Sequence, residues 1–183
     1  DGLKVLEGIG FDKRIGNQFL SPGAGYGGSC FPKDVKALIA ISRQNGYEFS
    51  LLEDVEKIND QAIASMISKA KKLLEDDIKD KTIAVLGLYF KPDTDDMRDA
   101  PSIKIINKLV ESGAKIKAYD RVAVENAKKI IKDIEFCKDS YDTATGADLL
   151  IVLTEWNEFK QLDLLKIKSL MNNPIILDGR NIY

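Results

Sequence analysis

Apolar residues in the first 80 positions recur at the three- and four-residue spacing of amphipathic helices. The spacing predicts a short helix at the start of the chain and a second helix from Pro32 to Asn45. A longer pattern from Ser50 to about Ile78 predicts one helix of roughly 27 residues, about 40 Å long, because neither Gly nor Pro interrupts it. Glu53 would complete a capping box with Ser50. We expect a helix of this length to bridge two domains or to support a subunit interface.

From about residue 80 the pattern changes to short apolar runs that alternate with amphipathic segments. Each apolar run is typical of a buried parallel strand. We expect strands near residues 82–88, 114–119, 134–137, 148–153 and 174–177. We expect helices near residues 101–112, 122–132 and 162–171, and a short helix before residue 148. This alternation predicts a parallel sheet with helices on both of its faces.

The two patterns divide the chain into two regions. We predict an α/β fold in which a helical dimerisation segment, residues 1–80, precedes a Rossmann-like parallel-sheet domain, residues 81–183. Ligands of such sheets bind outside the carboxyl ends of the strands. The segments that follow these ends are residues 87–98, 120–121, 154–155 and 178–180. We therefore expect a ligand site where these segments meet.

Composition excludes several classes of function. The 183 residues contain 27 Lys and Arg against 29 Asp and Glu, and this net charge of −2 gives no reason to expect a nucleic-acid or membrane partner. No run approaches the roughly 18–20 apolar residues of a membrane-spanning helix. The sequence contains no histidine, which excludes Ser-His-Asp and Cys-His hydrolases and histidine-bound zinc. Any catalysis must therefore use Cys, Lys, Asp, Glu, Asn or backbone groups.

Cys30 is the candidate reactive residue of the chain. The sequence has only one other cysteine, Cys137, and two cysteines cannot form a disulfide framework. This number suits a reducing compartment, so we expect the protein in the cytoplasm. Cys30 follows a loop with four glycines in residues 23–28 and precedes a predicted helix, with Lys33 nearby. Helix N-terminal amides and a cation favour a thiolate, and glycines let the backbone approach a ligand. The alternative is a small core cysteine behind a structural loop, which is how we interpret Cys137.

The turn after the first strand is a weak indication of a dinucleotide site. The strand ends in Gly87, and Asp120 closes the next strand as a ribose-binding acid would. However, no G-x-G-x-x-G begins at this turn, since the next glycine is Gly113. The loop between Lys91 and Arg98 instead offers two cations to a phosphate, or is a solvated charged loop. Its aspartates lack the ligand spacing of an EF-hand, so we expect no metal.

Four ordered motifs resemble signatures of the UDP-glucose/GDP-mannose dehydrogenase family. Residues 25–34, GYGGSCFPKD, resemble its active-site cysteine motif, and residues 87–98, GLYFKPDTDDMR, resemble the opening of its C-terminal domain. Residues 154–157, TEWN, and 178–181, DGRN, resemble two later signatures. The resemblance is greatest to the branch that oxidises UDP-glucose. In the N-acetylmannosamine branch a histidine precedes the cysteine, where this chain has Ser29, and the GDP-mannose branch stays open.

The resemblance implies a reaction and a set of catalytic residues. The reaction would be a four-electron oxidation of the C6 alcohol of a UDP-sugar to a carboxylate, with two NAD⁺ consumed. Cys30 would capture the C6 aldehyde as a thiohemiacetal, whose hydride loss gives a thioester that water hydrolyses. Asp34 would help to activate that water or to position a catalytic lysine, and Arg98 would contact NAD.

The resemblance also implies contacts with the substrate and with a second subunit. The implied substrate-binding residues are Arg14, Phe19, Leu20, Gly25, Tyr26, Gly27, Gly28, Phe90, Lys91 and Arg180. Phe90 and Lys91 would meet the sugar diphosphate, and Arg180 would reach the nucleotide sugar. Arg14 would extend into the site of a partner subunit, which implies a homodimer formed through the long helix 50–78.

The resemblance covers only the later part of the family's chains. Family members carry an NAD-binding domain ahead of the matched region, and this chain begins with Asp1 rather than methionine. We therefore expect a C-terminal portion that needs an NAD-binding half and is inactive alone. The alternatives are a non-catalytic nucleotide-sugar-binding and dimerisation module, or a dehydrogenase of GDP-mannose or UDP-N-acetylmannosamine.

Overall fold

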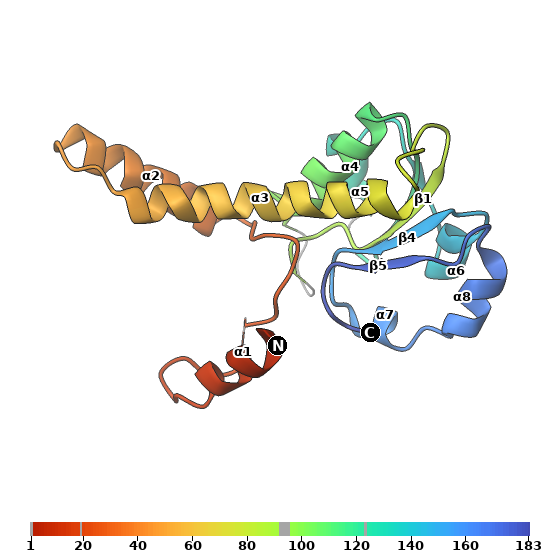
Figure 1. Ribbon diagram of the computed structural model, residues 1–183, viewed down its shortest axis with the longest axis horizontal. Coiled ribbons are helices and arrows are strands. Elements are labelled where there is room, and N and C mark those ends of the chain that lie inside the picture. Colours follow the sequence, from red (N-terminus) through yellow and green to blue (C-terminus); the bar gives the residue numbers. More distant parts are fainter. Residues whose placement is uncertain (1, 19, 92–95, 123) are drawn as a thin grey trace.

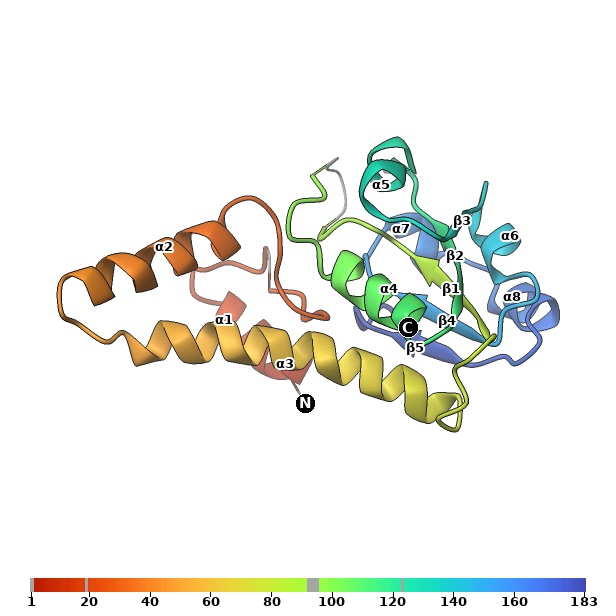
Figure 2. The same cartoon turned by 90° about the horizontal axis from the view of Figure 1, so that it is seen from above.

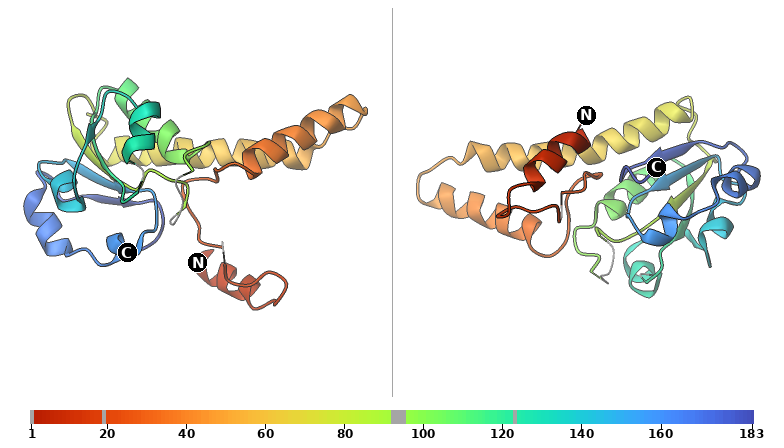
Figure 3. Two further views of the ribbon diagram at one scale, coloured as in Figure 1. Left: turned by 180° about the vertical axis from the view of Figure 1, so that it is seen from behind. Right: turned by 90° about the horizontal axis from the view of Figure 1, so that it is seen from below.

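The computed structural model describes residues 2–18, 20–91, 96–122 and 124–183. Figure 1 shows an α/β domain from which helices project to one side. The projecting helices are α1 (Gly2–Gly10), α2 (Phe31–Gln44) and the first half of α3 (Ser50–Leu73), which together we call the helical arm. Helices α2 and α3 run side by side as an antiparallel pair in Figures 1 and 2, whereas the left view of Figure 3 shows α1 standing apart from both.

The α/β domain is built on a five-stranded parallel sheet with the strand order β3-β2-β1-β4-β5. The strands are β1 (Thr82–Leu86), β2 (Lys115–Tyr119), β3 (Glu135–Phe136), β4 (Leu149–Val152) and β5 (Ile176–Asp178). The helices are α4 (Pro101–Glu111), α5 (Val124–Ile130), α6 (Ser140–Ala144), α7 (Asn157–Lys160) and α8 (Leu164–Leu170). Helices α3 and α4 lie on one side of the sheet, and α6 and α8 lie on the other (Figure 2). The predicted parallel α/β architecture is confirmed.

The hydrophobic core lies on both faces of the sheet and extends under α3. All four residues of β4 are buried, as are four of the five in β1, because helices cover both faces of these central strands. The side of α3 that faces the sheet adds Ile63, Met66 and Ala70 to the same core. The division of the chain at residue 80 stays a prediction, since this core takes residues from both regions.

The long helix is shorter than its apolar spacing predicts. It ends at Leu73, and Glu75 and Asp76 take positive φ values of 54° and 59°. Leu74 and Ile78 keep the helical spacing in the sequence, but both are buried in the core. The prediction of a helix to residue 78 is therefore wrong, because the packing of these two side chains under the sheet ends the helix early.

The predicted capping box at the start of α3 is also wrong. The N-cap residue is Phe49, Ser50 is already helical, and no side chain caps the helix. The Glu53 carboxylate instead accepts hydrogen bonds from Arg43 of α2, with Nη2 2.6 Å from Oε1. This ion pair joins the two long helices of the arm. The predicted end of α2 is confirmed, with Asn45 at the C-cap.

Gly87 tests the close packing at the end of β1. Its φ is +90°, and a Cβ there would lie 2.5 Å from the Thr154 side chain and 2.7 Å from its backbone nitrogen. We expect Gly87→Ala to lower the free energy of unfolding by about 3 kcal/mol, measured by urea denaturation, since strain and overpacking add. Gly8→Ala is the matched control, because a Cβ at Gly8 meets nothing within 4 Å. Equal stability of the two variants would contradict the packing described here.

Candidate active site

A cleft of about 620 Å³ opens where the loop of residues 21–30, which we call the glycine loop, meets the carboxyl edge of the sheet. Its lining residues are Ser21, Gly23, Gly25, Tyr26, Gly27, Phe31, Phe90, Lys91, Glu155 and Arg180. Phe90 and Lys91 follow β1, Glu155 follows β4, and Arg180 follows β5. The cleft therefore lies at the edge of the sheet where ligands of this fold class bind. Figure 2 shows the segment before α2 reaching toward the sheet domain beside α3.

The glycine loop packs against the α/β domain where a side chain does not fit. A Cβ at Gly27 would lie 2.3 Å from the carbonyl oxygen of Asp99, and one at Gly28 would lie 2.7 Å from the Phe90 ring. Gly28 also has a φ of +88°, and its N–H donates to the carbonyl of Arg98 at 2.9 Å. Glycine thus lets the loop backbone contact the segment that follows β1 directly.

Arg180 and Glu155 form an ion pair at the wall of the cleft. Arg180 Nη2 lies 2.5 Å from Glu155 Oε1, and the two side chains are only 10% and 19% exposed. A Cβ at Gly23 would lie 2.0 Å from Arg180 Nη1, so the guanidinium packs on a glycine backbone. Among the described residues, Arg180 Nε and Glu155 Oε2 have no hydrogen-bond partner although they are buried. A guanidinium held in this way at a cleft wall is suited to bind an anion.

Glu155 was missed as a site residue by the sequence analysis. The sequence placed it in a motif and at the carboxyl end of a strand, which is the available signal. What the sequence does not show is the ion pair, because Glu155 and Arg180 come from different strands. The distance between them follows from the pairing of β4 with β5.

Cys30 lies at the start of α2 and is exposed. Its Sγ is 3.7 Å from the Ser29 hydroxyl oxygen. The pKa of Lys33 is raised first by Asp34 and also by Cys30, and the pKa of Arg98 is raised first by Asp96 and also by Cys30. Two cations therefore lie within electrostatic range of the sulfur. Cys30 itself does not line the cleft, but its neighbour Phe31 does.

Asp96 ties the glycine loop to the segment before α4. The Asp96 carboxylate accepts two hydrogen bonds from the Arg98 guanidinium, both at 2.9 Å, and one from the backbone N–H of Arg98 at 3.0 Å. The pKa of Asp96 is lowered to about 2, chiefly by the Arg98 side chain and to a smaller extent by a hydrogen bond from Ser29. The residue before the cysteine and the predicted cofactor-contacting arginine thus share one carboxylate.

Asp96 gives a prediction about stability in acid. Because its folded pKa lies below the ordinary value of 3.8, its stabilising effect is complete above about pH 4 and is lost as pH falls toward 2. Between pH 4 and 2 the free energy of unfolding of Asp96→Asn should fall less than that of the parent, by about 1 kcal/mol. The full linkage value is larger, but Arg98 is 72% exposed and water screens the pair. The measurement is urea denaturation at each pH. Free energies of unfolding that fall in parallel for Asp96→Asn and the parent would contradict this account.

The remaining predicted site residues fall into four groups. Gly25, Tyr26 and Lys91 line the cleft, and Lys91 Nζ lies 5.3 Å from the centroid of the Phe90 ring. Asp34 and Leu20 do not line it, and the Asp34 carboxylate pairs with Lys33 at 2.5 Å. Arg14 lies after α1, is 88% exposed and pairs with Asp12. Phe19 and the segment 92–95, with Asp93 and Asp95, lie outside the described residues.

The sheet domain does not fit a dinucleotide at the turn after β1. Asp120, which would hold a ribose, is 1% exposed and accepts hydrogen bonds from Leu88 N–H at 2.8 Å and from the Trp156 indole at 3.3 Å. The Thr154 side chain occupies the space beside Gly87. Residues 23–28 match the letters G-x-G-x-x-G, but residues 2–18 and 20–22, which the structure describes ahead of them, contain no strand. Groups of His, Cys, Asp or Glu with metal-binding geometry are absent from the part of the chain that the structure describes.

Comparisons with known proteins cover both regions of the chain. Residues 84–183 match the UDP-binding domain of the UDP-glucose/GDP-mannose dehydrogenase family, and residues 1–61 match its central domain. A UDP-glucose 6-dehydrogenase from Rhizobium meliloti is 45% identical over 98% of this chain and 41% of its own length. The enzyme of this name called YwqF in Bacillus subtilis is 46% identical over 98% of this chain and 41% of its own length. The chain therefore spans about two fifths of these relatives.

Solved structures show the same relationship. A UDP-glucose dehydrogenase from Pyrobaculum islandicum matches 98% of this chain and 40% of its own, with a TM-score of 0.86 and 30% identity. A UDP-D-ManNAc dehydrogenase from Pyrococcus horikoshii matches 99% of this chain and 40% of its own, with a TM-score of 0.79 and 29% identity. The predicted resemblance is confirmed, and the chain belongs to the UDP-glucose/GDP-mannose dehydrogenase family.

Proposed function

We propose that this chain is the substrate-binding and cysteine-bearing part of an NAD-dependent UDP-glucose 6-dehydrogenase. The observation that carries the proposal is the cleft, in which the wall formed by the glycine loop faces Lys91 and Arg180 at the carboxyl edge of the sheet. The wall formed by the glycine loop leads to the Cys30 thiol, which lies within electrostatic range of Lys33 and Arg98. The opposite wall presents the positive charges of Lys91 and Arg180, which suit a diphosphate. The relatives named for UDP-glucose support this substrate over the alternatives.

The nucleotide diphosphate would bind at the sheet edge. Arg180 is fixed there by Glu155, so little side-chain freedom is lost when an anion binds. Lys91 supplies a second positive charge from the segment after β1. Phosphate oxygens carry the negative charge that these two groups would stabilise. The sugar would then extend along the glycine loop toward Cys30.

Cys30 would act on the aldehyde that the first oxidation of C6 produces. Its thiolate sulfur forms a bond to C6, and the carbonyl oxygen takes a proton, which gives a thiohemiacetal. Loss of a hydride from C6 together with the proton of its hydroxyl group converts this adduct to a thioester. Water then adds to C6 and the carbon–sulfur bond breaks, which releases the carboxylate and the thiol. Asp34, one helical turn after Cys30, is the group proposed to help activate that water.

NAD supplies the two-electron acceptor for each oxidation when it is bound. The sheet domain does not fit it at the turn after β1, so we propose that another part of the enzyme binds it, with Arg98 in contact. We expect no turnover from this chain alone.

The helical arm supports a homodimer as part of this proposal. Apart from Phe31, which lines the cleft, the exposed apolar side chains described for the helical arm and for the loops next to its helices are Leu3, Val5, Ile9, Phe11, Ile15, Leu38, Ile41, Tyr47, Leu51 and Ile58. Apolar side chains exposed in such numbers on one part of a protein mark an interaction site. Arg14, in the same region, is the residue proposed to reach the partner's cleft.

Among the described residues, no helix combines the length and apolar character needed to cross a bilayer.

Isothermal titration calorimetry of this chain tests the substrate. We expect UDP-glucose and UDP to bind, and GDP-mannose and UDP-N-acetylmannosamine to bind more weakly. Tighter binding of either competing sugar nucleotide would reassign the substrate within the family.

A binding module without catalysis is the second candidate, because Cys30 lies outside the lining of the cleft. The two are separated by turnover in a chimera that places this chain behind the N-terminal part of the Rhizobium meliloti relative, where NADH formation identifies the enzyme.

A further inference from the structure

We propose that Asn59 of α3 is a positioning residue that fixes the glycine loop and thereby shapes the wall of the cleft. The apolar spacing and the family resemblance predict only a bridging and dimerisation role for α3. Asn59 is half-buried and lies in the middle of this helix, 33 positions after Tyr26. The ligand named in the test rests on the proposed function, whereas the placement of the loop does not.

Asn59 binds the backbone of Tyr26 on both sides of the residue. The Tyr26 N–H donates to Asn59 Oδ1 at 2.7 Å, and Asn59 Nδ2 donates to the Tyr26 carbonyl at 3.4 Å. One side-chain amide thus satisfies both backbone polar groups of Tyr26, which itself lies in neither a strand nor a helix. An amide is the neutral side-chain group that offers a donor and an acceptor in this arrangement.

The residue before Tyr26 is shaped for this contact. Gly25 has a φ of +120°, and a Cβ there would lie 2.8 Å from Asn59 Oδ1 and 3.4 Å from the Ile63 side chain. A side chain at position 25 would therefore separate the loop from α3. The missing Cβ lets the amide reach the Tyr26 backbone.

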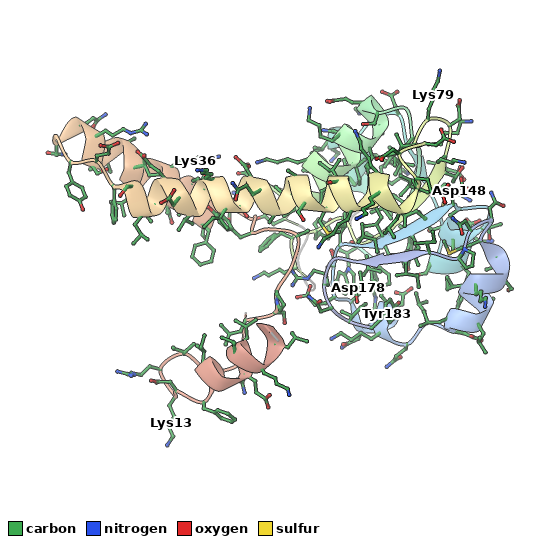
Figure 4. All side chains as sticks on the ribbon, viewed as in Figure 1. Lys13, Lys36, Lys79, Asp148, Asp178 and Tyr183 are labelled. Atoms are coloured by element: carbon green, nitrogen blue, oxygen red, sulfur yellow. The ribbon has the colours of Figure 1, made fainter. Side chains whose placement is uncertain are left out.

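A second residue of α3 holds the side chain of Tyr26. The Tyr26 hydroxyl donates to Glu56 Oε1, and Glu56 Oε2 lies 4.0 Å from Lys36 Nζ on α2. Figure 4 shows Lys36 where α2 lies alongside α3. Burial first, and then the hydrogen bond to Glu56, raise the pKa of Tyr26, so the hydroxyl stays protonated and donates. Glu56 lies three residues before Asn59, on the same face of the helix.

The contacts of Tyr26 with α3 affect the shape of the cleft, because Tyr26 is part of its wall. Tyr26, Gly25 and Gly27 all line the cleft, and the next residue, Gly28, is bonded to the Arg98 carbonyl. The loop is therefore held by α3 on one side and by the segment before α4 on the other. Cys30 follows Tyr26 by four residues, so its position depends on both attachments.

Asn59→Leu tests the proposal, because leucine keeps the volume and removes both hydrogen bonds. In hydrogen-exchange mass spectrometry of this chain we expect exchange of the loop peptide that contains Tyr26 and Gly28 to rise about tenfold. Peptides from β1 and β4 should be unchanged. The affinity for UDP-glucose should fall about tenfold, with the thermal midpoint held within a few degrees. Gln61→Leu, an exposed residue two positions further along α3, is the matched control.

Three results would overturn the proposal. They are unchanged exchange of the loop, faster exchange throughout the sheet as well as the loop, and faster loop exchange with full UDP-glucose affinity. If Asn59→Leu does not fold, Asn59→Asp replaces it, because the carboxylate keeps the acceptor for the Tyr26 N–H and loses the donor to its carbonyl. Absence of UDP-glucose binding by the parent chain would instead contradict the proposed function, and the exchange data would still decide the placement of the loop.

Discussion

Cys30→Ser lowers the turnover of the chimera by about 10³-fold or more, while its affinity for UDP-glucose stays within about twofold of the parent. The sulfur is exposed at the start of α2 and lies within range of the charges of Lys33 and Arg98. A serine hydroxyl is a far weaker nucleophile than a thiolate at neutral pH, so the second oxidation of C6 loses its covalent intermediate. Steady-state NADH formation and calorimetry measure the two effects separately.

Cys137→Ser is the matched control for this substitution. Cys137 is 6% exposed next to β3, and burial raises its pKa, so it should behave as a core residue. We expect the control to keep full turnover, with at most a modest loss of stability. Turnover retained in the Cys30 variant would exclude a covalent role for that sulfur. Turnover lost in both variants would indicate a structural rather than a chemical effect.

Arg180→Gln is expected to lower the affinity for UDP-glucose by about 100-fold or more. The substitution removes the charge that would meet the diphosphate, and charge-assisted bonds to a guanidinium contribute several kcal/mol where the group is screened from water. It also leaves the Glu155 carboxylate without its ion-pair partner, although the Glu155 side chain is only 19% exposed. We therefore expect a loss of stability of about 2–3 kcal/mol in the same variant.

The double variant Arg180→Gln with Glu155→Gln separates the two effects. Removing the unpaired carboxylate should restore most of the stability, measured by urea denaturation, without restoring affinity. The single variant Glu155→Gln keeps an acceptor for the guanidinium and should lose less affinity than Arg180→Gln. Wild-type affinity in Arg180→Gln would show that the diphosphate does not bind at this edge of the sheet.

The sheet was predictable because its central strands are buried on both faces. Burial of this kind requires continuous apolar runs, and β1 and β4 are such runs in the sequence. The end of α3 was not predictable, since Leu74 and Ile78 continue the helical spacing in the sequence, whereas the backbone leaves the helix through the positive φ values of Glu75 and Asp76. The short helix α7 was missed because its four residues are too few to show a periodic pattern.

The candidate site was predictable where chemistry lies in consecutive residues. The glycine loop and Arg180 could be identified from motifs, and the structure brings them to one cleft. The roles of Glu155, Asn59 and Asp96 depend on contacts between segments distant in the sequence or on hydrogen bonds within a loop. Such contacts have no sequence pattern of their own, because they depend on how the chain folds.

Covalent capture of the sugar on Cys30 tests the central claim most directly. The chimera carrying Asp34→Asn, which should slow the hydrolysis of a thioester, is mixed with UDP-glucose and NAD⁺, quenched in acid, digested and analysed by mass spectrometry. We predict that the peptide containing Cys30 carries the mass of the oxidised nucleotide sugar, and that the adduct disappears with Cys30→Ser. NADH formation without an adduct on that peptide, or with an adduct at Cys137, would contradict the account.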